Sequence, residues 1–106
     1  MLFRSIGIYS SEPPADGFRY ENLQRQVDAF PLREAVVDWE GPVTIEAYTV
    51  AHQKGRPRIA HAACLTDDDR RSWGTVEDPG VMDAMMREEF CGRRGRLAAG
   101  GALSVA

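Results

Sequence analysis

Residues 41–53 read GPVTIEAYTVAHQ, and this stretch decides the fold. From Val43 to Gln53 it is rich in β-branched residues, which favour a strand whose side chains alternate between two faces, and Gly41-Pro42 separates this strand from the residues before it. One face is expected to carry Val43, Ile45, Ala47 and Thr49, and the other Thr44, Glu46, Tyr48 and Val50. The KGRP that follows, residues 54–57, is typical of a hairpin turn, so a returning strand is expected over residues 58–65.

Outward from this hairpin, the sequence predicts further short strands. Candidates lie at residues 35–39 and 72–77, and a last hairpin joins residues 95–99 and 102–106 across a pair of glycines. Both faces of the main hairpin are fairly apolar, which suits a small closed or nearly closed barrel. The prediction is a mainly β fold, a small antiparallel OB-like β-barrel of five or six strands over residues 34–106.

One short helix is expected within this barrel, inserted before the final pair of strands. Asp78 is a good helix cap, and Pro79 suits the first helical position. The apolar side of the helix is expected to carry Val81, Met82, Met85 and Met86. Because methionine readily fills gaps in protein cores, we interpret this stripe as core and not as a cofactor pocket.

The segment before the barrel, residues 12–33, is predicted to be a linker that contains a short helix. Asn22 can cap this helix, and Pro31 can end it. Its apolar face is expected to carry Leu23, Val27 and Phe30. Such a face is expected to pack on the barrel or on a neighbouring domain.

Residues 1–11 predict a single strand, which the prolines at 13–14 end. The strand has no partner nearby in the sequence, so we expect an orphan. The tetrapeptide LFRS at residues 2–5 is also what the end of a common sequencing adapter, CTC-TTC-CGA-TCT, encodes. We therefore hypothesise a reading frame cut at its 5′ end; the alternative is a native start at Met1.

Composition is that of an ordinary globular protein. The 106 residues suffice for one small domain, with 43% hydrophobic and 27% charged residues. The net charge of −3 argues against a general nucleic-acid binder, whose affinity depends on neutralising phosphates. No apolar run approaches the roughly 20 residues of a membrane span, and a signal peptide is not apparent, so the expected location is the cytoplasm.

Three stretches, taken together, point to a family. They are GIYSSEPP at residues 7–14, GPVTIEAYTV at residues 41–50 and GRRGR at residues 92–96. Their residue types, order and spacing resemble the additional C-terminal domain of the thiolase-like protein type 1 family. Members of that family are often labelled acetyl-CoA acetyltransferases.

The resemblance implies a small β-barrel that follows a thiolase fold. Residues 1–11 would then be the last strand of that fold. The implied function is that of a non-catalytic accessory domain, which packs on or covers the thiolase-like body of an acyl-CoA-related bacterial protein of lipid metabolism. The body would be the partner in cis, and CoA would be available only through the parent protein, whose own activity stays open.

No catalytic residue is predicted in this chain, because the family's catalytic positions lie upstream of the matched stretches. No metal ligand is predicted either, because His52 and His61 are not at metal-ligand spacing and neither cysteine is part of a Cys-x-x-Cys pair. His61 and Cys64 are three apart on a predicted strand and point to opposite faces, so they cannot form a nucleophile–base pair. Cys91 begins a Cys-Gly-Arg run that resembles the Cys-x-Gly motif of true thiolases, but its spacing and position are wrong. Both cysteines are interpreted as reduced thiols.

The best candidate for ligand binding is the arginine-rich stretch at residues 92–96. Arginine grips phosphate through a planar fork, so Arg93, Arg94 and Arg96 are the candidate contacts for a phosphate of CoA. Arg93 and Arg94 are adjacent and point apart, so at most one of them faces a given ligand, together with Arg96. The alternative is that these arginines are solvated or paired with Glu88 and Glu89.

Two other functions stay open. One is a free-standing OB-like binding module for an oligonucleotide or a small ligand, with Trp39, Tyr48 and Trp73 as a stacking surface. Acidic neighbours disfavour this reading, and the three residues can equally be ordinary core and rim aromatics. The other is an enzyme in its own right, which needs a concave site with a perturbed histidine or cysteine.

Overall fold

The structure is a computed structural model that describes residues 5–106. The chain divides into two units, Met1–Pro31 and Leu32–Ala106. The second unit begins two residues before the predicted start of the barrel at residue 34. The assignment of residues 1–11 to the end of a preceding domain stays a prediction.

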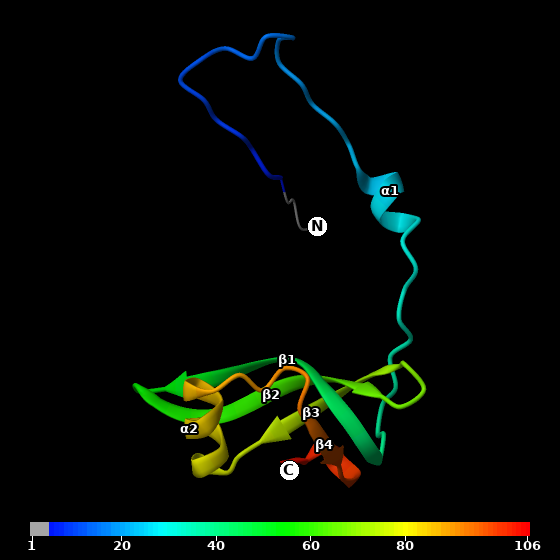
Figure 1. Ribbon diagram of the computed structural model, residues 1–106, viewed down its shortest axis with the longest axis vertical. Coiled ribbons are helices and arrows are strands. Elements are labelled where there is room, and N and C mark those ends of the chain that lie inside the picture. The colour runs from blue at the N-terminus through cyan, green and yellow to red at the C-terminus, as the bar shows by residue number, and fades with distance from the viewer. Residues whose placement is uncertain (1–4) are drawn as a thin grey trace. The chain divides into compact units, whose positions relative to one another are not determined.

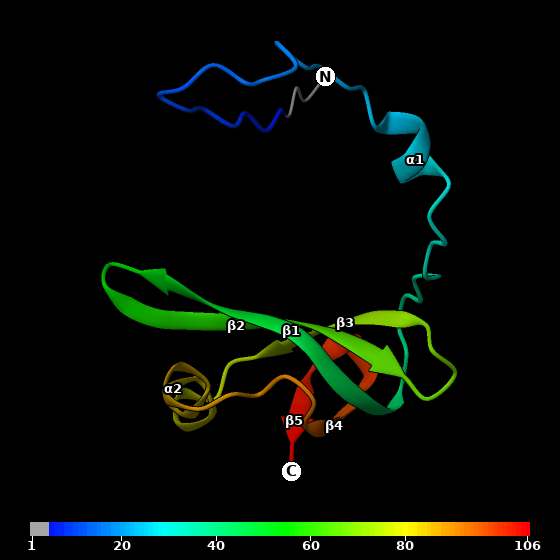
Figure 2. The same ribbon diagram turned by 45° about the horizontal axis from the view of Figure 1, so that its top comes forward.

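The helices and strands form a mainly β structure. The helices are α1 (Gln24–Asp28) and α2 (Pro79–Arg87), with a 3₁₀ turn at Ala99–Gly101. The strands are β1 (Gly41–Gln53), β2 (Arg56–Thr66), β3 (Arg71–Val76), β4 (Arg94–Leu97) and β5 (Leu103–Val105). They form one antiparallel sheet in the order β3-β2-β1-β4-β5 (Figures 1 and 2). The predicted β class, with one helix before the last two strands, is confirmed.

The β1–β2 hairpin confirms the strand predicted over residues 43–53, which starts two residues earlier than predicted, at Gly41. A β-bulge alters its faces. The register shifts between Ile45 and Ala47, which leaves Glu46 as the extra residue. Beyond the shift, Tyr48 joins the face that packs on the core. The prediction that Ile45 and Ala47 share a face was therefore wrong, because one inserted residue moves the following side chains to the opposite face.

The sheet curls, but it does not close into a full barrel. Its two edges are β3 and β5. Along the described chain they meet through one isolated bridge, between Thr75 and Ala102. Gly74 allows this approach, because a Cβ there would lie 3.1 Å from Leu103 Cβ in β5. The predicted OB-like barrel is thus an open, strongly curled sheet.

The core lies between one face of the sheet and α2, which Figure 2 shows beside the β1–β2 hairpin. Asp78 caps α2 as predicted, since its carboxylate accepts the Val81 N–H at 2.9 Å. Met82 and Met85 are buried and Met86 is exposed, so most of the methionine stripe is core, as interpreted from the sequence. The buried apolar residues are Val43, Ile45, Ala60, Ala62, Cys64, Val76, Met82, Met85, Phe90, Leu97 and Leu103.

The strand predicted at residues 35–39 is not formed in the described structure, where a single bridge to β3 takes its place. Arg71 N–H donates to Glu34 C=O, and Val36 N–H donates to Arg71 C=O, each at 2.8 Å. Asp38 then has a φ of 59°, in the left-handed region. This turn takes the chain away from β3 before a second pair can form, so the strand prediction was wrong.

The N-terminal unit contains α1 and, within its described residues, no strand. Residues 5–11 form no strand within the described chain, which contains no hydrogen-bonded neighbour for them, so their pairing with an upstream domain stays a prediction. Residues 1–4 of that prediction lie outside the described residues. The predicted helix is confirmed but shorter, and Asn22 Oδ1 accepts the Gln24 N–H at 3.0 Å. The side chains of its apolar face are exposed: Leu23, Val27 and Phe30.

Candidate functional site

Residues 92–96 lie where the chain enters β4, and β1 fixes their backbone. Gly92 N–H donates to Ile45 C=O at 2.7 Å, and Ile45 N–H donates to Arg93 C=O at 3.0 Å. Arg93 N–H donates to Phe90 C=O at 3.1 Å. The N–H groups of Gly92 and Arg93 are thus already used, so a phosphate here would have to be held mainly by arginine side chains.

Arg93 is engaged within the chain. Its Nη2 lies 2.7 Å from Glu88 Oε2, and its guanidinium carbon lies 4.1 Å from the centroid of the Phe90 ring. Stacking and ion pairing together hold the planar group in one orientation. This matches the alternative stated from the sequence, in which the arginines pair with neighbouring carboxylates.

Arg94 and Arg96 occupy alternate positions on β4 and are both exposed. Arg94 Nη1 lies 2.9 Å from Asp67 Oδ1 and 3.0 Å from Thr44 Oγ1. The Arg96 guanidinium makes no hydrogen bond or ion pair to any residue between 5 and 106. Arg93 and Arg94 contact different carboxylates, as expected for neighbours that point apart.

The electrostatics of this stretch leave Arg96 as the accessible cation. The ion pairs of Arg93 and Arg94 are exposed, and exposed pairs contribute about 0–1 kcal/mol. A phosphate at this stretch would therefore bind Arg96 directly. It would displace Glu88 from Arg93 and Asp67 from Arg94 at little cost in free energy. Whether these arginines bind a phosphate stays a prediction.

The cysteines and the histidine considered for catalysis lie apart. Cys64 is buried, and burial raises the pKa of its thiol to about 11. Cys91 is exposed, and hydrogen bonding to the Glu89 carboxylate raises the pKa of its thiol. A thiol with a raised pKa holds little of the nucleophilic thiolate near neutral pH. His61 lies on the opposite face of β2 from Cys64, as predicted, with its ring 5.9 Å from the Trp73 ring.

The three aromatic residues considered as a stacking surface do not share one. Tyr48 packs against the core, and its hydroxyl donates to Glu88 C=O at 3.0 Å. Trp73 is on the outer face of β3 and is 59% exposed. Trp39 is partly buried against the core, with the Arg70 guanidinium carbon 5.6 Å from its ring centroid. This separation gives no support to an oligonucleotide-binding module.

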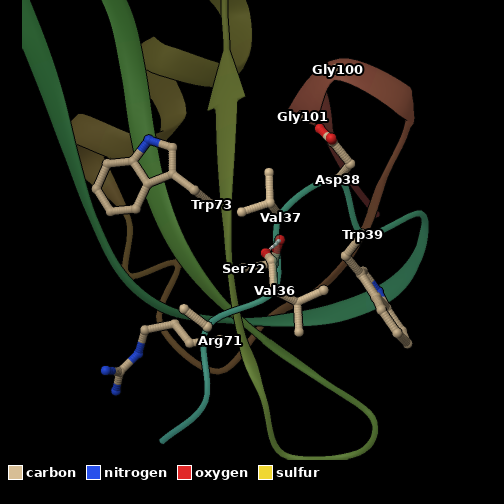
Figure 3. Close-up of a pocket in the computed structure, with 10 residues that line it drawn as sticks. Val36, Val37, Asp38, Trp39, Arg71, Ser72, Trp73, Gly100 and Gly101 are labelled. Atoms are coloured by element: carbon tan, nitrogen blue, oxygen red, sulfur yellow. Dashed lines mark hydrogen bonds between the residues drawn. The ribbon is translucent and has the colours of Figure 1, made fainter.

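A hollow of about 380 Å³ lies beside the β3 edge (Figure 3). Three segments line it, at residues 35–39, 71–73 and 100–101. Its volume is at the small end of the range of ligand pockets. The sequence does not predict this hollow, because it forms where Asp38 turns the chain out of an expected strand, and no periodic pattern marks such a turn.

Within residues 5–106, no three side chains of histidine, cysteine, aspartate or glutamate are placed to hold a metal ion. The same part of the chain has no helix that is long and apolar enough to cross a membrane.

Residues 22–102 match the family model described as the thiolase-like protein type 1 additional C-terminal domain. The chain belongs to this family. The match contains the β1–β2 hairpin and residues 92–96, whereas the stretch at residues 7–14 precedes it. No curated protein matches the chain.

Among solved structures, the chain is similar to a monomeric SCP2-thiolase-like protein type 1 from Mycobacterium smegmatis. The TM-score is 0.69 at 23% identity, and the likeness covers 92% of this chain and 22% of that protein. At this identity the likeness shows the fold alone. The chain spans about a fifth of the length of that protein.

Proposed function

We propose that the chain is a non-catalytic accessory domain that packs against a thiolase-like body in the same polypeptide. The description of its family, an additional C-terminal domain of thiolase-like proteins, supports this partner. The raised thiol pKa values of Cys64 and Cys91 support a role without a nucleophile. Acyl-CoA chemistry would then belong to the body.

The observation that carries the proposal is the uncovered apolar surface of the N-terminal unit. Its large apolar side chains are between 80% and 100% exposed at Ile6, Ile8, Tyr9, Phe18 and Tyr20. Burying one such side chain stabilises a structure by about 1.5–3 kcal/mol. Exposed apolar groups gathered in one segment therefore indicate a surface that another part of the protein covers.

The proposal is tested by measuring how the separately expressed body binds this chain in a calorimetric titration. We expect the double change Ile8→Asp and Phe18→Asp to weaken binding at least tenfold, because about 1.4 kcal/mol is a factor of ten. The control is Ala47→Asp, which adds a carboxylate at an exposed position of β1. Unchanged binding by the double variant, or equal loss in the control, would contradict the proposal.

The arginines of residues 92–96 take a secondary role in this proposal, as contacts for a phosphate of CoA. Acetyl-CoA titrated into the chain is expected to give saturable heat that Arg96→Ala removes. Arg58→Ala, at another exposed arginine on β2, should leave the heat unchanged. No saturable heat from the unmodified chain would exclude these arginines as a CoA site of the isolated domain.

The proposal also places the protein in the bacterial cytoplasm and in acyl-CoA-related lipid metabolism. Cys64 and Cys91 are both free thiols, which suits a reducing compartment. The similar solved protein comes from a mycobacterium, which supports a bacterial source.

A further inference from the structure

The outer end of the β1–β2 hairpin extends beyond the rest of the sheet. β1 pairs with β4 only as far as Thr44, and β2 pairs with β3 only from Ala60 onward. Residues 51–59 therefore pair only with one another, as a two-stranded ribbon that Figures 1 and 2 show ending in a tight turn. Residues 52–58 are all exposed, so no other part of the described chain covers this ribbon, named here the basic arm.

The basic arm carries positive charge and no negative charge. Its cations are Lys54, Arg56 and Arg58, and the hairpin from residue 47 to residue 66 contains no acidic residue. The rest of residues 32–106 has 12 acidic and seven basic side chains, a net charge of −5. This unit is thus acidic overall, with unbalanced positive charge gathered at one exposed end.

The three cations of the basic arm also differ from most other basic residues of this unit in their pairing. Their side chains form no hydrogen bond or ion pair with any residue between 5 and 106. Six of the seven other basic residues of the unit are in ion pairs: Arg33, Arg70, Arg71, Arg87, Arg93 and Arg94. The basic arm is therefore where this unit leaves several neighbouring cations available to a partner.

Two backbone features of the basic arm do not strengthen the hairpin. Lys54 has a φ of 51°, in the left-handed region that hairpin turns usually fill with glycine, asparagine or aspartate. Arg58 has no partner residue in β1, so it is the extra residue of a second β-bulge. Bulges bend a strand and redirect its side chains, and they are frequent next to active sites. The placement of both cations thus favours contact with a partner over stability of the hairpin.

We propose that the basic arm binds a short acidic segment of a partner protein other than the thiolase-like body. The planar guanidinium group binds a carboxylate through two parallel hydrogen bonds, so Arg56 and Arg58 suit glutamate and aspartate side chains. Charge complementarity of this kind determines the choice of partner and speeds association.

The composition and position of the basic arm favour a transient partner over permanent packing against the body. Permanent interfaces are largely apolar, whereas the only apolar side chain among residues 52–58 is that of Pro57. The chain before this unit joins it elsewhere, since residues 34–36 bond to Arg71, which pairs with Leu65. The start of β2 lies nine residues from that point, which is about 30 Å of strand.

A protein segment is favoured over a nucleic acid because the positive charge is confined to the basic arm. A DNA duplex carries one phosphate charge per 1.7 Å or so of its axis, along its whole length. It would continue past the basic arm to the acidic remainder of the unit, whose charge repels phosphates within a screening length of about 8–10 Å. A short acidic segment can end where the positive charge ends.

The test is a nuclear magnetic resonance titration of the ¹⁵N-labelled chain with capped hexaglutamate at low salt. We expect saturable shifts at the amides of residues 53–56 and 58. The dissociation constant should be in the millimolar range, because each exposed ion pair is weak. Capped hexaglutamine should cause no shifts there, and salt should weaken the binding of hexaglutamate. No saturable shifts with hexaglutamate, or equal shifts with both peptides, would overturn the proposal.

A pair of charge-removing variants provides the matched control. The double change Arg56→Gln and Arg58→Gln removes two exposed cations from the basic arm and should weaken hexaglutamate binding at least threefold. Arg96→Gln removes an exposed and unpaired arginine on β4 and should leave the shifts in the basic arm unchanged. A folded double variant that binds hexaglutamate as tightly as the unmodified chain would contradict the proposal.

Two further titrations separate the other possible occupants. A short DNA duplex that binds the basic arm more tightly than hexaglutamate does would assign it to nucleic acid and overturn the proposal. The whole protein, with its thiolase-like body, should bind hexaglutamate as the isolated chain does, and loss of binding there would assign the basic arm to the body instead. The titrations of the isolated chain do not involve the body, so their outcome is separate from that of the proposed packing.

Discussion

Glu46 is the residue at which the side-chain pattern of β1 changes, and it is also the carboxylate that Arg71 binds. Arg71 Nε lies 2.7 Å from Oε2, and Nη2 lies 2.8 Å from Oε1. As the extra residue of the bulge, Glu46 thus joins β1 to β3 across the intervening strand β2. The hydrogen bonds from Arg71 lower the pKa of Glu46 below its ordinary value of 4.5.

The lowered pKa predicts a pH-dependent contribution to stability. The folded state holds the Glu46 carboxylate more strongly than the unfolded chain does, so the pair stabilises the fold above pH 4.5. This contribution is lost as the pH falls through the lowered pKa. Urea unfolding of the unmodified chain and Glu46→Gln should show the largest difference in unfolding free energy at neutral pH and a smaller one near pH 3. A difference that does not change with pH would contradict this account.

Leu97 and Leu32 form a matched pair for testing where the core lies. Leu97 is 1% exposed and packs in the core, whereas Leu32 is 93% exposed. Leu97→Ala should lower the free energy of unfolding by about 2–5 kcal/mol, because it removes buried methyl groups and leaves a cavity. Leu32→Ala should change it by no more than about 0.5 kcal/mol. Chemical denaturation of both variants would measure this, and similar losses would show that the core is misplaced.

Among the elements, α2 depends on its first turn, where Asp78 accepts the Val81 N–H. Asp78→Ala should lower the free energy of unfolding by about 1 kcal/mol, since it leaves that donor without its cap. Asparagine caps helices about as well as aspartate, so Asp78→Asn should cost much less. Denaturation curves would test this, and equal losses in the two variants would assign the effect to charge and not to the cap.

The elements that the sequence predicted correctly are those with a local signal. The alternation in β2 and the Asp78 cap each act within a few residues, and the structure confirms them. The hairpin turn predicted at residues 54–57 is also present, but it is shorter, because it consists of Lys54 and Gly55 and β2 already begins at Arg56. The bulge at Glu46 and the turn at Asp38 were not predictable in this way. Both depend on the register of β1 and β3 against their neighbours, which forms only when distant segments pair.

In the candidate site at residues 92–96, too, the feature set by neighbouring residues was predictable from the sequence, and the feature set by distant pairing was not. The sequence predicts that adjacent residues Arg93 and Arg94 point apart, and they do contact different partners. It does not predict that the partner of Arg94 is Asp67, which is 27 residues away. That contact depends on the pairing of β1 with both β2 and β4.

At the scale of the whole molecule, the division into two units predicts that the stability of the fold comes from residues 32–106. All the buried residues of the described chain lie there, and α1 has none. Deleting residues 1–31 should therefore change the free energy of unfolding of the isolated chain by no more than about 0.5 kcal/mol. Urea denaturation would measure this, and failure of residues 32–106 to fold would contradict it.

The central claim is that the N-terminal unit is covered by a thiolase-like body in the same polypeptide. The most direct test is amide hydrogen exchange of residues 5–31, measured in the isolated chain and in the whole reading frame recovered from the source DNA. The account predicts fast exchange in the isolated chain and strong protection in the whole protein. Equally fast exchange in both, or a reading frame that encodes no thiolase-like body, would contradict it.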